Sequence, residues 1–281
     1  MLNKQQIREL VIKLYNECKG NMITEDFALV PEIVGTKIFD EPIMGFGSAQ
    51  DSLFDEYLEV GKIGPWFMKP EKWLPGAKSV VSVFFPFSEE VKNSNRSCTE
   101  GPSAQWLHGR IEGQAFVSKF SIELRDALMA EGIKACAPAV DERFKSVSGG
   151  NNFREYPQCN EKTFGSNWSE RHAAFVCGLG TFGLSKGLIT KKRMAGRFAS
   201  VIIDLELEAD ERPYKEVYEY CTKCGACVKR CPVNAISIEN GKDHMICGPW
   251  MRKTAEMYAP RYGCGLCQTK VPCESCIPRK Q

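Results

Sequence analysis

Helical and strand-like patterns of apolar residues alternate along the first 205 positions of the chain. Residues 1–19 and 113–131 place apolar side chains every three or four positions, which predicts two amphipathic helices. Residues 77–87 and 198–203 are runs of β-branched and aromatic side chains, which predict buried strands. Because the spacing is not that of regular βαβ units, we expect an α+β fold or a mixed α/β fold.

The pattern changes after residue 205, where cysteines become frequent. Of the 14 cysteines, five are scattered through residues 1–205, and the other nine lie within residues 221–276. The acidic stretch 206–213 between the two regions has the composition of a connecting loop. We therefore predict two domains, residues 1–205 and a cysteine-rich domain of residues 206–281.

Net charge and the lengths of apolar runs exclude some classes of protein. The 37 basic and 35 acidic residues nearly cancel, so the total charge gives no reason to expect a polyanionic partner. Residues 1–19 lack the apolar core of a signal peptide, and no apolar run is long enough to span a membrane. Fourteen cysteines without an export signal favour reduced thiols that bind metal, and hence the cytoplasm.

The cysteine spacing between residues 221 and 232 is the strongest chemical signal. Cys221, Cys224, Cys227 and Cys231, followed by Pro232, form the C-x2-C-x2-C-x3-C-P run typical of [4Fe–4S] proteins. Short gaps let three thiolates bind one cubane, while the fourth cysteine points towards a second cluster. Zinc sites separate their ligand pairs by longer spacers, so we expect an iron–sulfur cluster.

Five more cysteines follow this run, which is enough for a second cluster. The crossed ligand pattern of two-cluster ferredoxins predicts one cubane on Cys221, Cys224, Cys227 and Cys273. The other cubane would then bind Cys231, Cys247, Cys264 and Cys267. Two alternatives stay open: Cys276 in place of Cys273, or a single cluster with spare thiols.

Two further motifs have both a functional and a structural interpretation. Gly178, Gly180 and Gly183 match the dinucleotide-binding string G-x-G-x-x-G, but they follow a predicted helix instead of a strand. These glycines would instead allow close approach to a flat ligand, or form a tight turn. His108 lies in a polar and aromatic stretch, residues 106–110, that could line a pocket or pack in the core.

Taken together, the motifs resemble those of epoxyqueuosine reductases and reductive dehalogenases, a group of corrinoid iron–sulfur enzymes. The stretch Ser169–Ile189 is similar to the family's AGLG-x-x-GK-x-x-x-LI segment, and it is more specific than the cysteine run. The resemblance covers most of the chain, and its motifs occur in the family's order. They are Trp73–Val83, Trp106–Ile111, Ser169–Ile189, Phe198–Ile203, Cys221–Cys231 and Tyr262–Gln268.

The resemblance implies a nitroreductase-like domain that holds base-off cobalamin, followed by a ferredoxin-like domain with two [4Fe–4S] clusters. A low-potential donor such as ferredoxin or flavodoxin would supply electrons, which would pass through the clusters to the corrinoid. The substrate would be a small molecule or a modified nucleoside. The implied cofactor contacts are His108, Arg110, Gly178, Leu179, Gly180, Thr181, Phe182, Gly183, Ser185 and Lys186.

The sequence departs from the family in two places. Ile111 stands where the family has a proton-donating Asp, so the acid would be the neighbouring Glu112, unless Glu112 is an exposed helix carboxylate. The chain also ends shortly after Cys276, so we expect it to lack the helical repeats that bind tRNA. That makes tRNA a doubtful substrate.

These departures keep other functions open. The chain could be an electron carrier or a reductive activator of a corrinoid protein, with no substrate turnover of its own. A flavin-dependent reductase on the same core is a third hypothesis, and a yellow bound chromophore would distinguish it. A purely structural role for the clusters is the weakest hypothesis, because two adjacent cubanes suit electron transfer better.

Overall fold

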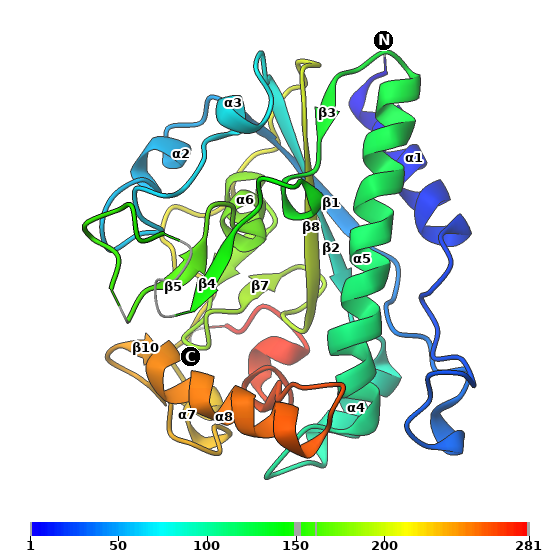
Figure 1. The fold of residues 1–281 in the computed structure, drawn as a ribbon, viewed down its shortest axis with the longest axis vertical. Helices are drawn as coiled ribbons and strands as arrows, with labels where there is room; N and C mark the ends of the chain where they lie inside the picture. The colour runs from blue at the N-terminus through cyan, green and yellow to red at the C-terminus, as the bar shows by residue number, and fades with distance from the viewer. Residues whose placement is uncertain (1, 149–152, 161, 280–281) are drawn as a thin grey trace.

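The computed structural model describes residues 2–148, 153–160 and 162–279. Its centre is an antiparallel four-stranded sheet with the strand order β1–β2–β8–β3 (Figure 1). All eight residues of β2 are buried because protein covers both faces of the sheet. The two strands predicted from apolar runs are confirmed as the central pair of this sheet. The strands are β1 (Ile43–Ser48), β2 (Ser79–Pro86), β3 (Ala135–Cys136) and β8 (Gly196–Ile203).

Two helices cover one face of the sheet, α1 (Lys4–Glu17) and the long α5 (Ala104–Ala130) (Figure 1). The ring centroids of Phe120 on α5 and Phe85 on β2 lie 4.9 Å apart, edge to face. Both predicted helices are confirmed, but α5 begins earlier than the apolar stripe indicates. The Ser103 hydroxyl accepts a hydrogen bond from the Trp106 amide at 3.1 Å and so caps the helix.

The hydrophobic pattern does not predict the first turns of α5, because glycines replace apolar residues there. A Cβ at Gly109 would lie 2.7 Å from the ring of Phe87, and one at Gly113 would lie 2.9 Å from the ring of Phe39. The helix therefore packs closely on two aromatic rings through small residues, which leaves no hydrophobic periodicity to read. This close contact fixes the part of α5 that carries residues 106–112.

The opposite face of the sheet packs against α6 (Glu170–Val176) and the segments around Trp73 and Trp168. The Trp168 indole donates a hydrogen bond to the Ser200 hydroxyl of β8 at 2.9 Å. The remaining regular elements are short. They are α2 (Leu53–Glu56), α3 (Pro70–Trp73), α4 (Glu89–Arg96), α7 (Ala226–Lys229) and the hairpins β4/β5 (Ser146–Ser148, Phe164–Ser166), β6/β7 (Gly180–Phe182, Leu188–Thr190) and β9/β10 (Ile236–Ser237, Gly241–Lys242).

The segment that follows β8 stays on the core before the cysteines begin. The Asp210 carboxylate pairs with Lys4 at 2.5 Å and with Arg8 at 3.1 Å, and accepts a hydrogen bond from the Phe46 amide at 3.0 Å. The Tyr214 hydroxyl donates to the Phe175 carbonyl at 2.7 Å. The stretch predicted as a connecting loop is therefore irregular but firmly attached to the core.

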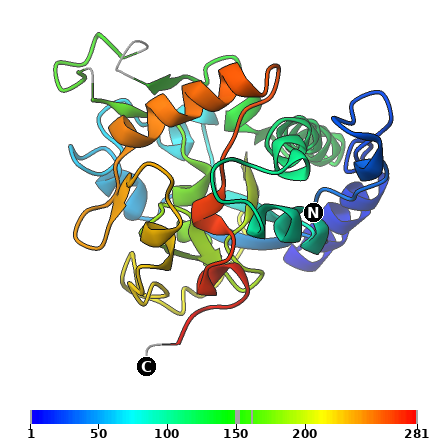
Figure 2. The same cartoon turned by 90° about the horizontal axis from the view of Figure 1, so that it is seen from below.

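The cysteine-rich segments gather at one end of the sheet, together with helix α8 (His244–Met257) (Figure 2). The guanidinium of Arg230 links the segments at this end. Arg230 donates to the carbonyls of Asn95 and Cys98 in the core region, and to those of Leu266 and Thr269 near the C-terminus. These charge-assisted bonds link the cysteine loops to α4 and its following turn. No helix in the described ranges is long and apolar enough to cross a membrane.

Candidate functional site

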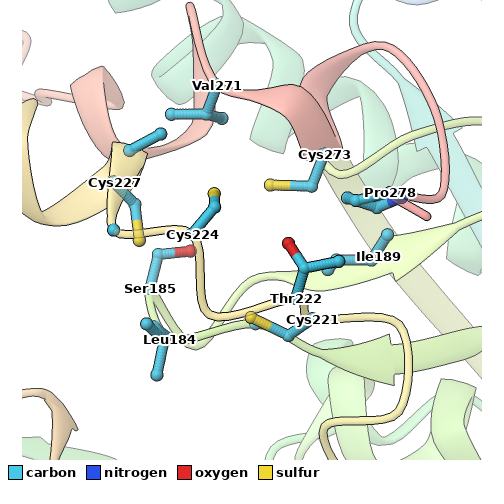
Figure 3. A pocket seen from close by; sticks show the side chains of 13 residues that line it. Leu184, Ser185, Ile189, Cys221, Thr222, Cys224, Cys227, Val271, Cys273 and Pro278 are labelled. Carbon is cyan, nitrogen blue, oxygen red and sulfur yellow. The ribbon is translucent and has the colours of Figure 1, made fainter. Parts of the chain in front are cut away.

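A first group of four thiols lines a small cavity beside the β6/β7 hairpin (Figure 3). Cys221 and Cys224 lie in the loop before α7, Cys227 is on α7, and Cys273 is in a 3-10 turn, Pro272–Glu274. We call these four side chains the first quartet. They come from two segments far apart in sequence, and the side chains of Leu184, Ile189 and Val271 complete the cavity wall.

Local structure explains how the two segments meet. Gly225 adopts a φ of +74°, which reverses the chain between Cys224 and α7. On the other side, the buried Glu274 accepts hydrogen bonds from Arg96 Nε at 2.9 Å and from the Lys270 amide at 2.7 Å. This ion pair fixes the turn that carries Cys273 against α4.

Burial makes two of these thiols, Cys227 and Cys273, reluctant to ionise without a counter-charge. It raises the pKa of Cys227 to about 11 and that of Cys273 to about 12, and the neighbouring thiols add to the effect. A thiolate is the form that binds iron, so metal binding would release protons and supply the missing positive charge. The first quartet thus supplies four sulfur atoms around one cavity, although no three described His, Cys, Asp or Glu side chains are already grouped closely enough to hold a single metal ion.

A second set of thiols opens into a much larger cavity of about 610 Å³. Cys247 is on α8, Cys231 and Cys264 lie in loops on either side of it, and Cys267 is in a 3-10 turn, Leu266–Gln268. We call these four the second quartet. Although burial opposes its charge, the thiols of Cys267 and Cys247 hold the pKa of Lys242 above its usual value.

The structure separates Cys276 from both quartets. Its thiol is exposed and donates a hydrogen bond to the Pro272 carbonyl at 3.6 Å, and it lines neither cavity. Three of the five early cysteines, Cys18, Cys136 and Cys177, are buried. The Cys177 thiol donates to the Val80 carbonyl of β2 at 3.3 Å, as expected for a core thiol.

The large cavity lies between the cysteine loops and the core domain. Its core wall comes from α5, α6 and the start of β8, through Arg110, Arg171 and Arg197. Aromatic side chains form another part of the wall and would suit a flat ligand. These side chains are Phe87, Trp106, Phe164, Trp250 and Tyr262.

Residues 178–186 line no part of this cavity, and their expected contacts with a ligand stay a prediction. Gly178 has a φ of +78°, and a Cβ there would lie 2.9 Å from the Glu211 carbonyl oxygen. At Gly180 a Cβ would collide with the Ile189 carbonyl of the paired strand β7. These glycines therefore accommodate protein backbone, and the stretch continues from α6 into a short hairpin, unlike a dinucleotide-binding turn.

The other residues of that stretch divide between core and small cavity. Leu179 and Phe182 pack in an apolar cluster with Tyr214, and the Thr181 hydroxyl accepts a hydrogen bond from the Tyr220 amide at 2.9 Å. Gly183 and Ser185 border the small cavity, whereas Lys186 lines neither cavity. The stretch thus positions the first quartet more than a large ligand.

Substitution of Gly180 separates the two interpretations of the glycines. We expect Gly180→Ala to destabilise the protein by roughly 3 kcal/mol even without any cofactor, because the added Cβ meets backbone. Gly183→Ala is the matched control, since its Cβ would be 3.5 Å from the Ile189 side chain, an ordinary contact. Thermal unfolding of the cofactor-free proteins measures this difference. Equal stability of both variants would contradict the backbone explanation.

His108 and Glu112, two expected site residues, form a structural network on α5. His108 is fully buried, and its Nε2 accepts a hydrogen bond from the Leu29 amide at 3.1 Å. The Glu112 carboxylate lies 3.1 Å from His108 Nδ1 and 2.6 Å from Arg261 Nη2. Neither side chain lines the large cavity, whereas Arg110 does.

The ionisation of Glu112 argues against the proton donor that we expected. Burial opposes its charge, but hydrogen bonds from His108 and Arg261 outweigh it and lower the Glu112 pKa to about 2. A carboxylate that is ionised at neutral pH can accept a proton but has none to donate. The geometry therefore favours a structural role for Glu112.

A different carboxyl group, Glu170, is held in its protonated form. Both of its carboxyl oxygens are buried without a hydrogen-bond partner in the described part of the chain. Burial raises its pKa to about 8, and nearby Ser200 and Trp168 offset only part of this effect. Sequence reasoning missed Glu170, because a glutamate at the start of a helix is ordinarily a solvated residue that favours the helix dipole.

The raised pKa of Glu170 predicts a specific pH dependence of stability. Because the folded state binds this proton more tightly, its contribution is present below pH 4.5 and is lost as pH rises towards about 8. The slope approaches roughly 1.4 kcal/mol per pH unit in that window. Glu170→Gln keeps the neutral shape, so wild type should lose stability relative to this variant between pH 5 and 8. A constant difference in thermal midpoint across this range would refute the assignment.

Comparison with known proteins agrees with the architecture of the site. The 4Fe-4S binding domain family matches residues 214–237. An epoxyqueuosine reductase of Cyclobacterium marinum is 27% identical over 216 residues, which are 73% of this chain and 61% of that protein. The chain therefore spans less than two thirds of the length of this curated relative.

Solved structures of epoxyqueuosine reductases share the fold. One from Streptococcus thermophilus aligns over 97% of this chain and 66% of its own, with a TM-score of 0.51 and 14% identity. Another, with an epoxyqueuosine-modified tRNA-Tyr stem loop, aligns over 95% and 65%, with a TM-score of 0.50 and 19% identity. Reductive dehalogenases also align, with TM-scores of only 0.42 to 0.46.

These findings confirm the resemblance that the motifs indicate. The curated homologues are epoxyqueuosine reductases, which are oxidoreductases, and the family match supports a [4Fe–4S] site. The likeness to solved structures shows a mixed α/β fold. The chain is thus an iron–sulfur protein similar to epoxyqueuosine reductase.

Proposed function

We propose that this protein is an oxidoreductase that passes electrons through two [4Fe–4S] clusters to a corrinoid, which reduces a bound substrate. The observation that carries the proposal is the division of eight thiols between two cavities, four in each. In this proposal the first quartet binds the outer cluster and the second quartet binds the inner one. Residues 206–281 carry the clusters, and residues 1–205 supply the cofactor and substrate domain.

The space between the two quartets suits electron transfer. Leu184, Ile236 and Cys267 form a buried apolar cluster that also contacts Cys221, Cys227 and Cys231. Members of both quartets therefore contact the same few apolar side chains. Cys231 lies four residues after Cys227, just beyond the end of α7, so one short segment contributes to both sites, as the crossed ligand pattern requires.

The large cavity has the chemistry to hold a corrinoid beside the inner cluster. Arg110 Nε and Trp250 Nε1 are buried donors without an acceptor in the described residues, and both side chains line this cavity. A corrin ring carries peripheral amide carbonyls that could accept these hydrogen bonds, and aromatic walls suit its flat faces. When bound, the corrinoid supplies the reducing metal centre, and the protein holds and orients it.

The substrate class follows from the relatives and from the site together. A solved neighbour holds an epoxyqueuosine-modified tRNA stem loop, which supports a modified nucleoside or a small molecule as substrate. The proposed electron source is a low-potential protein such as ferredoxin or flavodoxin. The chain's own residues exclude water with their aromatic walls and position the substrate against the cofactor.

Anaerobic reconstitution tests the corrinoid directly. The protein is purified without oxygen, incubated with hydroxocobalamin, desalted, and analysed for cobalt, with Trp250→Phe as a variant that removes one unpaired donor. We expect about one cobalt per chain in the wild type and weaker retention in the variant. Absence of retained cobalt would contradict the corrinoid, and bound yellow flavin would support the flavin-dependent alternative. Retained cobalt without any substrate turnover would instead favour the electron carrier.

A further inference from the structure

Three arginines from three different core elements meet at the wall of the large cavity. Arg110 is on α5, Arg171 is on α6, and Arg197 is on β8. Arg171 is exposed, whereas Arg110 and Arg197 are half-buried, and all three side chains line the cavity. The cavity wall in the described residues also contains Lys242 and Arg252 but no carboxylate.

The protein itself leaves much of this charge without partners. Arg197 donates from Nη2 to the Arg110 carbonyl at 3.0 Å, but its Nε is buried without an acceptor. Arg110 donates from Nη2 to the Tyr262 hydroxyl at 3.1 Å, and its Nε also lacks an acceptor. Arg171 makes no hydrogen bond or ion pair through its guanidinium within the described ranges.

Like charges held together in this way destabilise one another. Burial lowers the pKa of Arg197 well below its usual value, and the charges of Arg110 and Arg171 lower it further. A guanidinium keeps its proton in proteins, so these three neighbouring cations favour a negative charge in the cavity.

The inner cluster accounts for only part of that missing negative charge. A cubane with four thiolates is anionic. Lys242 would offset part of this charge, because Cys267 and Cys247 raise its pKa. The charge of Cys267 also favours the charged form of Arg171. Besides burial, the groups that shift the pKa of Arg197 most are Arg110, Arg171 and Tyr262, none of which is a thiol. The charge of Arg197 is therefore available to another ligand.

We propose that Arg171 and Arg197 bind the oxyanion of a small ligand, a carboxylate or a phosphate, inside the large cavity. Two guanidinium forks suit the paired oxygens of either group, and Arg110 adds a third positive charge on the same wall. The aromatic side chains of Trp106, Phe164 and Tyr262 would pack on the ligand's apolar body. This inference rests on the proposed function, because it names an anionic molecule as the substrate class.

Calorimetric titration with three probes of similar shape tests the oxyanion site. Benzoate, phenyl phosphate and the neutral benzamide share one ring and differ in the head group. They are titrated into the anaerobically purified protein with its clusters in place. We expect benzoate or phenyl phosphate to bind at least tenfold more tightly than benzamide, and the stronger of the two identifies carboxylate or phosphate as the group recognised.

Variants show whether the arginines are responsible. Arg197→Gln and Arg171→Gln should each remove most of the preference for the anionic probe, whereas Arg125→Gln, on the distant part of α5, should leave it unchanged. Circular dichroism and iron content identify any variant that fails to fold. Equal binding of benzamide, or an unchanged preference in folded Arg197→Gln and Arg171→Gln, would overturn the proposal. The assay needs neither electrons nor corrinoid, so its outcome is independent of a failure of the proposed redox function.

Discussion

Cys273→Ser should lose about half of the protein's iron. We expect the wild type to hold about eight iron atoms per chain after anaerobic reconstitution, and this variant about four. Cys273 shares the small cavity with Cys221, Cys224 and Cys227, so its removal leaves the first quartet with three thiolates. The second quartet lies in a different cavity and should keep its cubane. Iron and acid-labile sulfide analysis measures the loss.

Cys276→Ser is the matched control for this experiment. It removes a thiol three residues later in the same segment, but that thiol is exposed and lines neither cavity. We expect its iron content to equal that of the wild type. The opposite pattern, with iron lost from Cys276→Ser and kept by Cys273→Ser, would assign the eighth ligand to Cys276. Loss of all iron from Cys273→Ser would show that the two sites do not assemble independently.

Glu112→Ala should destabilise the protein by about 3 kcal/mol, the second large effect that we expect. The substitution leaves the guanidinium of Arg261 largely buried without its carboxylate, since Arg261 is only 7% exposed. Arg261 also donates to the Phe27 carbonyl at 2.7 Å, so it joins three distant segments at α5. Denaturant unfolding monitored by circular dichroism gives the free energy change.

The double variant Glu112→Ala/Arg261→Met distinguishes an ion pair from a proton donor. Removal of the unpaired cation should restore part of the lost stability, because an apolar side chain tolerates the site better than an isolated charge. A catalytic acid would behave differently. Glu112→Ala would then keep its stability and lose turnover, and the second substitution would restore nothing. That result would contradict the structural role that we assign to Glu112.

Local signals in the sequence were sufficient for the sheet and the cysteine run. The β-branched run in β2 and the spacing from Cys221 to Cys231 depend on neighbouring residues alone, so pattern and spacing predict them. The choice between Cys273 and Cys276 depends on the Arg96–Glu274 ion pair, which joins positions 178 residues apart. The sequence left that choice partly open because no local pattern carries it.

The role of the glycine-rich stretch and the grouping of three arginines could not be predicted from the sequence for the same reason. Gly180 is surrounded by the backbone of β7, and a glycine string alone does not distinguish a protein neighbour from a ligand. Arg110, Arg171 and Arg197 are isolated in sequence, and only the packing of α5, α6 and β8 brings them to one cavity. A guanidinium without an anionic partner can be recognised only when the contacts of each arginine are known.

Spin counting on the fully reduced protein tests the central claim, that two quartets hold two clusters, most directly. The anaerobic protein is reduced with excess dithionite, frozen, and examined by electron paramagnetic resonance with iron analysis of the same sample. Our account predicts two reduced cubanes per chain, with spectra broadened by magnetic coupling because members of the two quartets share one apolar cluster. A single uncoupled signal of one spin per chain, with about four iron atoms, would contradict it.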